Sequence, residues 1–182
     1  MRDGKLGLRD MFLVLCKKQF CLGLIPFVFL NIPLALIILF VSVKIDRYLG
    51  FKHFIGYPYN VIFFLIFSSA GFVIICQAYA YLIIVGQGMA CPYAGFKGTG
   101  KLVTTGPYAV VRHPSVIGKL LGVLSIGMLS GSFFFTFIVI PVLLTWSVYY
   151  NRFIQEELCV KKFGNEYVEY RKRVPMLIPK IK

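Results

Sequence analysis

The sequence is poor in acidic residues, histidine and metal-ligand motifs. Its 182 residues contain 7 Asp and Glu and 2 His against 20 Lys and Arg, which gives a formal net charge of +13. The five cysteines form no Cys-x-x-Cys pair, and none has metal-ligand spacing to His53 or His113. We therefore expect reduced thiols, no structural zinc and no other metal site.

A net charge of +13 is compatible with nucleic-acid binding, but the sequence lacks a separate basic domain that would bind it. The basic residues instead lie beside long apolar runs, in a chain that is 58% hydrophobic. Soluble domains are usually 45 to 50% apolar. The composition therefore indicates a membrane protein whose partner is the lipid bilayer, with no nucleic acid.

Long apolar runs predict the membrane spans. Residues 22–43 and 60–85 are each long enough to cross the hydrocarbon layer as a helix. The first run lacks an Ala-x-Ala-like cleavage site, so we expect it to be retained. The block from 114 to 150 is too long for one crossing, and the break at Ser130-Gly131-Ser132 divides it into spans 114–130 and 133–150, joined as a hairpin.

These runs predict a single all-α domain over residues 1–182, a polytopic membrane protein with about four transmembrane helices and a helical C-terminal tail. Sixteen Lys and Arg lie in segments 1–21, 86–113 and 151–182, against three between the first two spans. By the positive-inside rule both termini are cytoplasmic. Because the chain is short, we expect a prokaryotic plasma membrane.

Two smaller features complete this topology. Residues 1–21 end in a stretch that mixes apolar and basic side chains, which is typical of a helix in the headgroup layer that acts as a cationic anchor. The third span carries two Gly-x-x-x-Gly spacings, which predict close helix packing. Their glycines are Gly118, Gly122, Gly127 and Gly131.

Polar side chains gather in the cytoplasmic segments, first at the start of the third span. Pro114 suits the first turn of a helix, which puts His113 at the mouth of this span. The unpaired backbone N–H groups of such a turn favour an anion, and Arg112 and His113 would reinforce that site. The alternative is that Arg112 extends to lipid phosphate while His113 caps a buried turn.

The second polar group follows the fourth span. Arg152 and Glu156 are four residues apart and project from one face of a continuing helix. An ordinary surface ion pair is the alternative interpretation. Two features argue against it: carboxylates are scarce in this chain, and Arg preceding Glu is the less favourable helical order.

Both polar groups carry a known signature. The first consists of residues 102–108, then Arg112-His113-Pro114-Ser115 and Gly118. The second consists of Arg152, Glu156-Glu157, Phe163-Gly164, Glu166-Tyr167, Tyr170 and Val174-Pro175. Together they resemble, in the same order, the isoprenylcysteine carboxyl methyltransferase family and its phospholipid methyltransferase relatives. The resemblance covers roughly residues 97–179.

The resemblance implies methyl transfer from S-adenosylmethionine to a membrane-embedded acceptor, the carboxylate of an isoprenylcysteine-like or other lipid-borne substrate. It implies that Arg152 and Glu156 are catalytic, with Arg152 binding the acceptor and Glu156 holding the cofactor. The other implied cofactor-binding residues are Gly100, Lys101, Leu102, Val103, Tyr108, His113, Pro114, Ser115 and Val116. Val116 departs from the family pattern, which commonly has tyrosine there.

Three alternatives stay open at this point. The same scaffold resembles N-methyltransferases that act on phosphatidylethanolamine, in which Arg152 would bind the lipid phosphate. Sterol reductases are broadly similar in the C-terminal region, but the sequence lacks the glycine fingerprint that binds the pyrophosphate of a nicotinamide cofactor. The last alternative is a non-enzymatic membrane scaffold.

Overall fold

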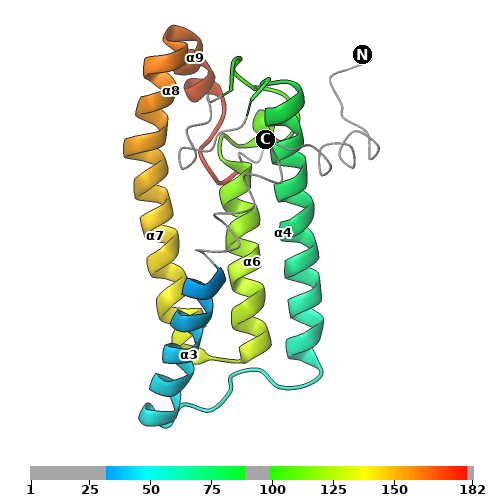
Figure 1. The fold of residues 1–182 in the computed structure, drawn as a ribbon, viewed down its shortest axis with the longest axis vertical. Coiled ribbons are helices and arrows are strands. Elements are labelled where there is room, and N and C mark those ends of the chain that lie inside the picture. The colour runs from blue at the N-terminus through cyan, green and yellow to red at the C-terminus, as the bar shows by residue number, and fades with distance from the viewer. Residues whose placement is uncertain (1–31, 89–98, 180–182) are drawn as a thin grey trace.

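The computed structural model describes residues 32–88 and 99–179, and all regular elements within these ranges are helices (Figure 1). In chain order they are α3 (Ile32–Leu49), α4 (Tyr59–Ile84), α5 (Pro107–Val110), α6 (Pro114–Ser130), η3 (Phe135–Val139), α7 (Ile140–Tyr150), η4 (Asn151–Gln155), α8 (Glu156–Phe163) and α9 (Asn165–Arg173). Elements η3 to α8 form one continuous helix, in which η3 and η4 are π-helical turns. The all-α prediction is confirmed for the described residues.

Among the described residues, two helices are long and apolar enough to cross a membrane, Tyr59–Ile84 and Phe135–Phe163. Helix α6, between them in the chain, is apolar but has 17 residues. The structure thus supports a helical membrane protein, while the count of four spans stays a prediction. The anchor proposed for residues 1–21 lies outside the described residues.

The first predicted span, 22–43, differs from the helix in the structure. Its described part begins at Ile32, and α3 continues to Leu49, beyond the predicted end. The added residues include Lys44, Asp46 and Arg47. Hydropathy marks the part of a helix that suits hydrocarbon, whereas backbone hydrogen bonding carries the helix on into the polar layer. The predicted end of the span is therefore not the end of the helix.

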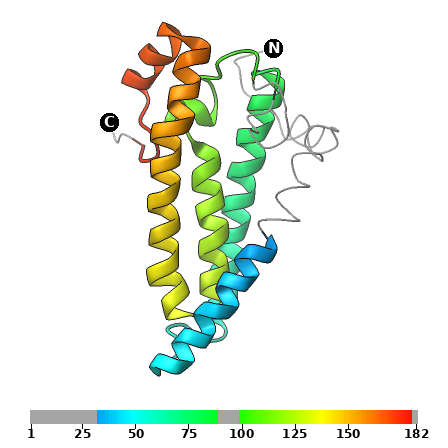
Figure 2. The same cartoon turned by 60° about the vertical axis from the view of Figure 1, so that its left-hand side comes forward.

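Glycines bring α4 and α6 into backbone contact, and the two helices run side by side (Figures 1 and 2). A Cβ added at Gly71 would lie 2.7 Å from the carbonyl oxygen of Gly118. Gly127 faces the start of the helix that runs from η3 to α8, and a Cβ added there would lie 2.7 Å from Thr136 Oγ1. Gly131 ends α6 with φ of +61°. Gly122 has open space beside it, so three of the four predicted glycines have a steric reason.

A buried carboxylate connects α3 to the hairpin that follows α6. Asp46 is 7% exposed and accepts hydrogen bonds from the backbone N–H of Phe134, at 2.9 Å, and from Ser132 Oγ. The Ser132 hydroxyl oxygen in turn accepts from the N–H of Phe135. These N–H groups belong to the first turn of a helix and have no partner within it. Asp46 and Ser132 therefore cap the continuous helix that runs from η3 to α8.

We expect Asp46→Ala to lower the stability of the protein by about 1 kcal/mol or more, because it leaves a helix N-terminus without its acceptor. For a chain of this length that corresponds to a fall in apparent unfolding temperature of roughly 2–4 °C. Thermal unfolding of detergent-solubilised protein measures it. The exposed neighbour Arg47, replaced by alanine, is the control, and an equal unfolding temperature for both variants would contradict the cap.

Candidate functional site

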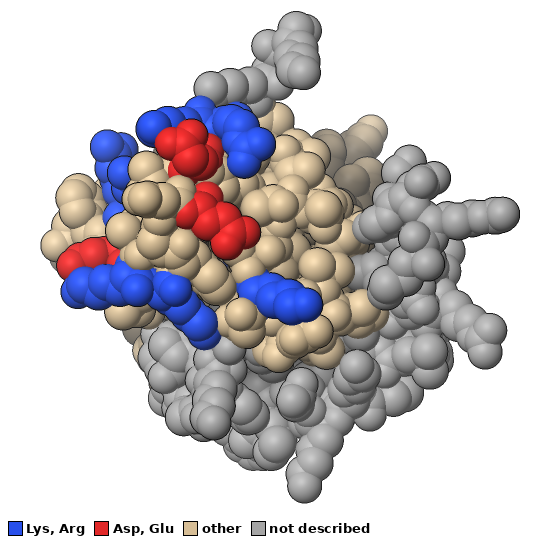
Figure 3. All heavy atoms as spheres, turned by 90° about the horizontal axis from the view of Figure 1, so that it is seen from above, with Lys and Arg blue, Asp and Glu red and all other residues tan. Residues whose placement is uncertain are grey.

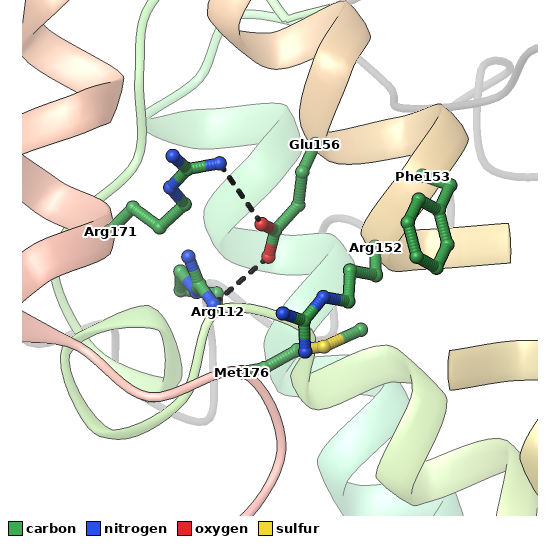
Figure 4. Close-up of a pocket in the computed structure, with 6 residues that line it drawn as sticks. All are labelled: Arg112, Arg152, Phe153, Glu156, Arg171 and Met176. Carbon is green, nitrogen blue, oxygen red and sulfur yellow. Dashed lines mark ion pairs between the residues drawn. The ribbon is translucent and has the colours of Figure 1, made fainter. Parts of the chain in front are cut away.

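Two segments that lie 43 residues apart in the chain meet at one end of the bundle (Figure 4). Arg112 and His113 precede α6, and Glu156 is the first residue of α8. Oxygen Oε1 of Glu156 lies 3.0 Å from Arg112 Nη2 and 3.4 Å from His113 Nε2. The predicted meeting of the α6 N-terminus with the helix after the fourth span is therefore present in the structure.

Glu156 is a buried carboxylate held by basic side chains. It is 3% exposed, and removing a carboxylate from water is costly unless it is paired. Arg112 is nearly as buried, and its Nε and Nη1 atoms have no hydrogen-bond partner. A third cation, Arg171 of α9, places Nη1 3.8 Å from Oε2 of Glu156. Within the described ranges Glu156 thus pairs with these groups and not with Arg152.

A cavity of about 530 Å³ lies beside this cluster. It is lined by Arg112, Arg152, Phe153, Glu156, Arg171 and Met176 (Figure 4). Its volume is within the range of pockets that hold small ligands. Three guanidinium groups and one carboxylate give the described lining a net positive charge, so the cavity is suited to an anionic ligand or to one that carries both charges.

A π-helical turn presents two of these residues to the cavity. The N–H of Glu156 bonds the carbonyl of Asn151, five residues earlier, and this wide turn contains Arg152 and Phe153. The buried Asn151 side chain donates to the carbonyl of Ser147 at 2.7 Å. Single π turns inside α-helices are frequent at functional sites. Arg152 and Glu156 line one cavity, as their spacing predicted, but through a turn wider than an α-helical one.

The C-terminal segment forms another wall of the cavity. The backbone N–H groups of Arg112 and His113 donate to the carbonyls of Pro175, at 2.9 Å, and Met176, at 3.2 Å. Tyr170 anchors α9, because its buried hydroxyl donates to the carbonyl of Tyr108 at 2.6 Å. Burial raises the pKa of the Tyr170 hydroxyl above its ordinary value, so this group stays a neutral donor.

The implied cofactor residues before α6 lie outside this lining. Val103 and Tyr108 pack in a buried apolar cluster with Ala78 and residues near the end of α4. Gly100 and Lys101 are exposed in a turn, and Leu102 is half-buried. Their assignment to the cofactor stays a prediction.

The implied cofactor residues in the first turn of α6 also lie outside the cavity lining. Pro114 and Val116 are buried and Ser115 is half-buried, and none of the three lines the cavity. His113 takes part through its contact with Glu156. The structure thus brings His113, Arg152 and Glu156 together and separates them from the other implied cofactor residues.

Sequence reasoning did not single out Phe153, Arg171 and Met176. Arg171 and Met176 follow the Gly164 turn, where φ of +56° ends α8 and redirects the chain. No periodic spacing relates them to Glu156 across such a turn. The one available signal was Val174-Pro175, because a proline disfavours helical backbone in the residue before it, and Val174 is extended and ends α9.

Comparison with known proteins identifies the family of this chain. The phospholipid methyltransferase family model matches residues 59–166, more than half of the chain. The described residues, all helical in their regular elements, with two helices long and apolar enough to cross a membrane and a charged cavity, fit this class. The chain belongs to the phospholipid methyltransferase family, and the predicted resemblance is confirmed.

Three relatives illustrate the similarity. The chain is 36% identical over 118 residues to protein-S-isoprenylcysteine O-methyltransferase of Schizosaccharomyces pombe, covering 63% of this chain and 49% of that protein. The human protein of this name is 40% identical over 88 residues, covering 46% and 29%. Cobalt-zinc-cadmium resistance protein CzcN of Cupriavidus metallidurans is 30% identical over 101 residues, covering 55% and 45%. No solved structure matches. The chain spans half or less of the length of these relatives.

We expect Glu156→Gln to destabilise the fold by about 3 kcal/mol, because it removes the only carboxylate from a described cluster that contains Arg112, His113 and Arg171. The apparent unfolding temperature should fall by roughly 5–10 °C in thermal unfolding of the purified protein. Glu157→Gln is the matched control, since the neighbouring Glu157 is exposed and pairs with Lys161 on the surface. If the two variants unfold at one temperature, Glu156 does not hold the cluster together.

Proposed function

We propose that this protein transfers a methyl group from S-adenosylmethionine to the carboxylate of a lipid-borne, isoprenylcysteine-like acceptor. The observation that carries the proposal is the charged cavity beside Glu156, in a chain with relatives named protein-S-isoprenylcysteine O-methyltransferase. An integral membrane enzyme with its site at the cytoplasmic end of the bundle follows from this proposal.

The charges of the cavity fit the cofactor. The methionine end of S-adenosylmethionine carries one ammonium and one carboxylate, and the cavity presents Glu156 beside guanidinium groups. Glu156 would hold the cofactor through its oxygens, and His113 and Arg112 hold Glu156 in place. The described residues contain no group of His, Cys, Asp and Glu suited to a metal ion.

The proposed reaction needs alignment more than acid–base chemistry. S-adenosylmethionine supplies a methyl group on a positively charged sulfur, and transfer to a carboxylate breaks one C–S bond and forms one C–O bond without releasing a proton. The protein therefore contributes orientation and exclusion of water. Arg152 faces the cavity and has no ion pair among the described residues, so its guanidinium is available to bind the acceptor carboxylate through two hydrogen bonds.

An exposed aromatic strip connects the membrane-facing side of the long helix to the cavity. The Phe153 ring borders the cavity and lies 4.9 Å from the Tyr149 ring, which lies 6.1 Å from Trp146. Tyr149 and Trp146 also line an apolar groove of about 550 Å³ with Pro141, Val142 and Thr145. This strip supports an acceptor whose apolar tail lies along the helix while its carboxylate reaches Arg152.

The length of the helix supports a site at the membrane surface. At 1.5 Å per residue, Phe135–Phe163 is about 44 Å long, and the hydrocarbon layer is about 30 Å thick. Its apolar run ends at Tyr150, which places Arg152 and Glu156 at the edge of that layer. Several Lys and Arg side chains lie on the described part of this end of the molecule (Figure 3), which favours the cytoplasmic side. We retain a prokaryotic plasma membrane with both termini cytoplasmic as part of the proposal.

The acceptor chemistry is tested by transfer of a radiolabelled methyl group from S-adenosylmethionine to membrane extracts by the purified protein. We expect labelled product that base treatment releases, because a carboxyl methyl ester is base-labile. Label that resists base would indicate the N-methylation alternative. A protein that neither transfers label nor binds S-adenosylhomocysteine would be the scaffold.

Arg152→Ala should lower turnover by roughly 10- to 100-fold, because a charge-assisted contact to the acceptor is lost. Calorimetric binding of S-adenosylhomocysteine should stay within about twofold of the unmodified protein, since Arg152 does not hold the cofactor in this proposal. Lys161→Ala, on the surface of α8, is the control and should change neither quantity. Full turnover in Arg152→Ala would remove this residue from the mechanism.

A further inference from the structure

The two oxygens of Glu156 have unequal partners. Oε1 lies within 3.0 Å of Arg112 and 3.4 Å of His113. Oε2 has Arg171 at 3.8 Å, which is well beyond the 2.7–2.9 Å of a charge-assisted hydrogen bond. The pair between Arg171 and Oε2 is thus an electrostatic contact without a hydrogen bond, and it borders the cavity.

Arg171 projects from a fixed helix. Its neighbour Tyr170 is 3% exposed and bonds the carbonyl of Tyr108, which holds α9 against the rest of the site. The Arg171 side chain itself is 47% exposed and enters the cavity from the side opposite to Arg152 (Figure 4). Its guanidinium therefore has both room and unused donors, on a backbone that does not have to move.

We propose that Arg171 binds the methionine carboxylate of S-adenosylmethionine, with the ammonium of the same group against Oε2 of Glu156. This inference rests on the proposed function and deepens it. An amino-acid group that displaces the exposed Arg171 side chain from Oε2 replaces one long contact with two short ones of matched charge. Arg171 is then a cofactor-positioning residue that the sequence signatures did not assign.

The positions of the arginines around the cavity suit two different carboxylates, that of the cofactor and that of the acceptor. The ammonium and carboxylate of an amino acid are separated by one carbon, so they need a carboxylate and a cation side by side, as Glu156 and Arg171 are. Arg152 instead lies next to Phe153 and the aromatic strip, where the acceptor tail is placed. Arg112 contacts Oε1 through Nη2 and its other guanidinium nitrogens are buried, whereas the Arg171 side chain is exposed beside the cavity. The methionine carboxylate therefore goes to Arg171 and the acceptor carboxylate to Arg152.

The test compares two ligands in calorimetric titrations of the full chain in detergent. They are S-adenosylhomocysteine and its decarboxylated analogue, which keeps the ammonium and the adenosine. Arg171→Ala should weaken S-adenosylhomocysteine binding by roughly 10- to 100-fold and leave binding of the analogue within about twofold. Arg171→Lys, which keeps the charge, should recover part of the loss. The protein should remain folded, because Oε1 of Glu156 keeps both of its partners.

Arg173→Ala is the matched control, since this exposed arginine of α9 contacts the Glu169 carbonyl and not the cavity. Undiminished S-adenosylhomocysteine binding in Arg171→Ala would overturn the inference and leave the proposed function intact. An equal loss for both ligands would also overturn it, because the effect would then not pass through the carboxylate. If the unmodified protein binds neither ligand, it is the proposed function that fails.

Discussion

The buried carboxylate of Glu156 is the constraint on which the site depends. A carboxylate that is 3% exposed requires nearby cations, and no basic side chain of its own helix pairs with it. The cations come from the residues before α6 and from α9. Because the interaction joins three parts of the chain, the electrostatics that satisfy Glu156 also set the shape of the cavity. Backbone bonds from Arg112 and His113 to the C-terminal segment fix the same geometry a second time.

The long helix from η3 to α8 connects the charged cavity to an apolar segment that suits a membrane. Its apolar part suits hydrocarbon, and its continuation through a π turn carries Arg152, Phe153 and Glu156 to the cavity without a loop in between. A rigid helical connection keeps the distance between the aromatic strip and the charged cluster constant. Asp46 caps the N-terminal end of the same helix, so buried carboxylates connect this helix to other segments both at its start and at Glu156.

The sequence predicted what depends on local pattern. Apolar length and the breaks at Pro114 and Gly131 located the helices, and the four-residue spacing of Arg152 and Glu156 put both beside one cavity. Their partners could not be predicted from spacing, because Arg112 and Arg171 reach Glu156 only through tertiary packing. Tyr108 shows the converse: its place in a family signature does not reveal that its side chain packs in the apolar cluster. A place in the signature therefore does not by itself distinguish a ligand contact from a contact that builds the site.

The excess of positive over negative side chains around the cavity affects both stability and ligand binding. The three arginines outnumber the one carboxylate and repel one another, more strongly in low-dielectric surroundings than in water. Bound anions relieve that repulsion, so ligand binding and stability are linked: a ligand that binds the folded state alone raises the free energy of unfolding. The aromatic strip adds no charge and contributes through burial of apolar surface. The two halves of the proposed lipid-borne acceptor would thus be held by different forces: salt would weaken attraction to the arginines and leave the contribution of the tail almost unchanged.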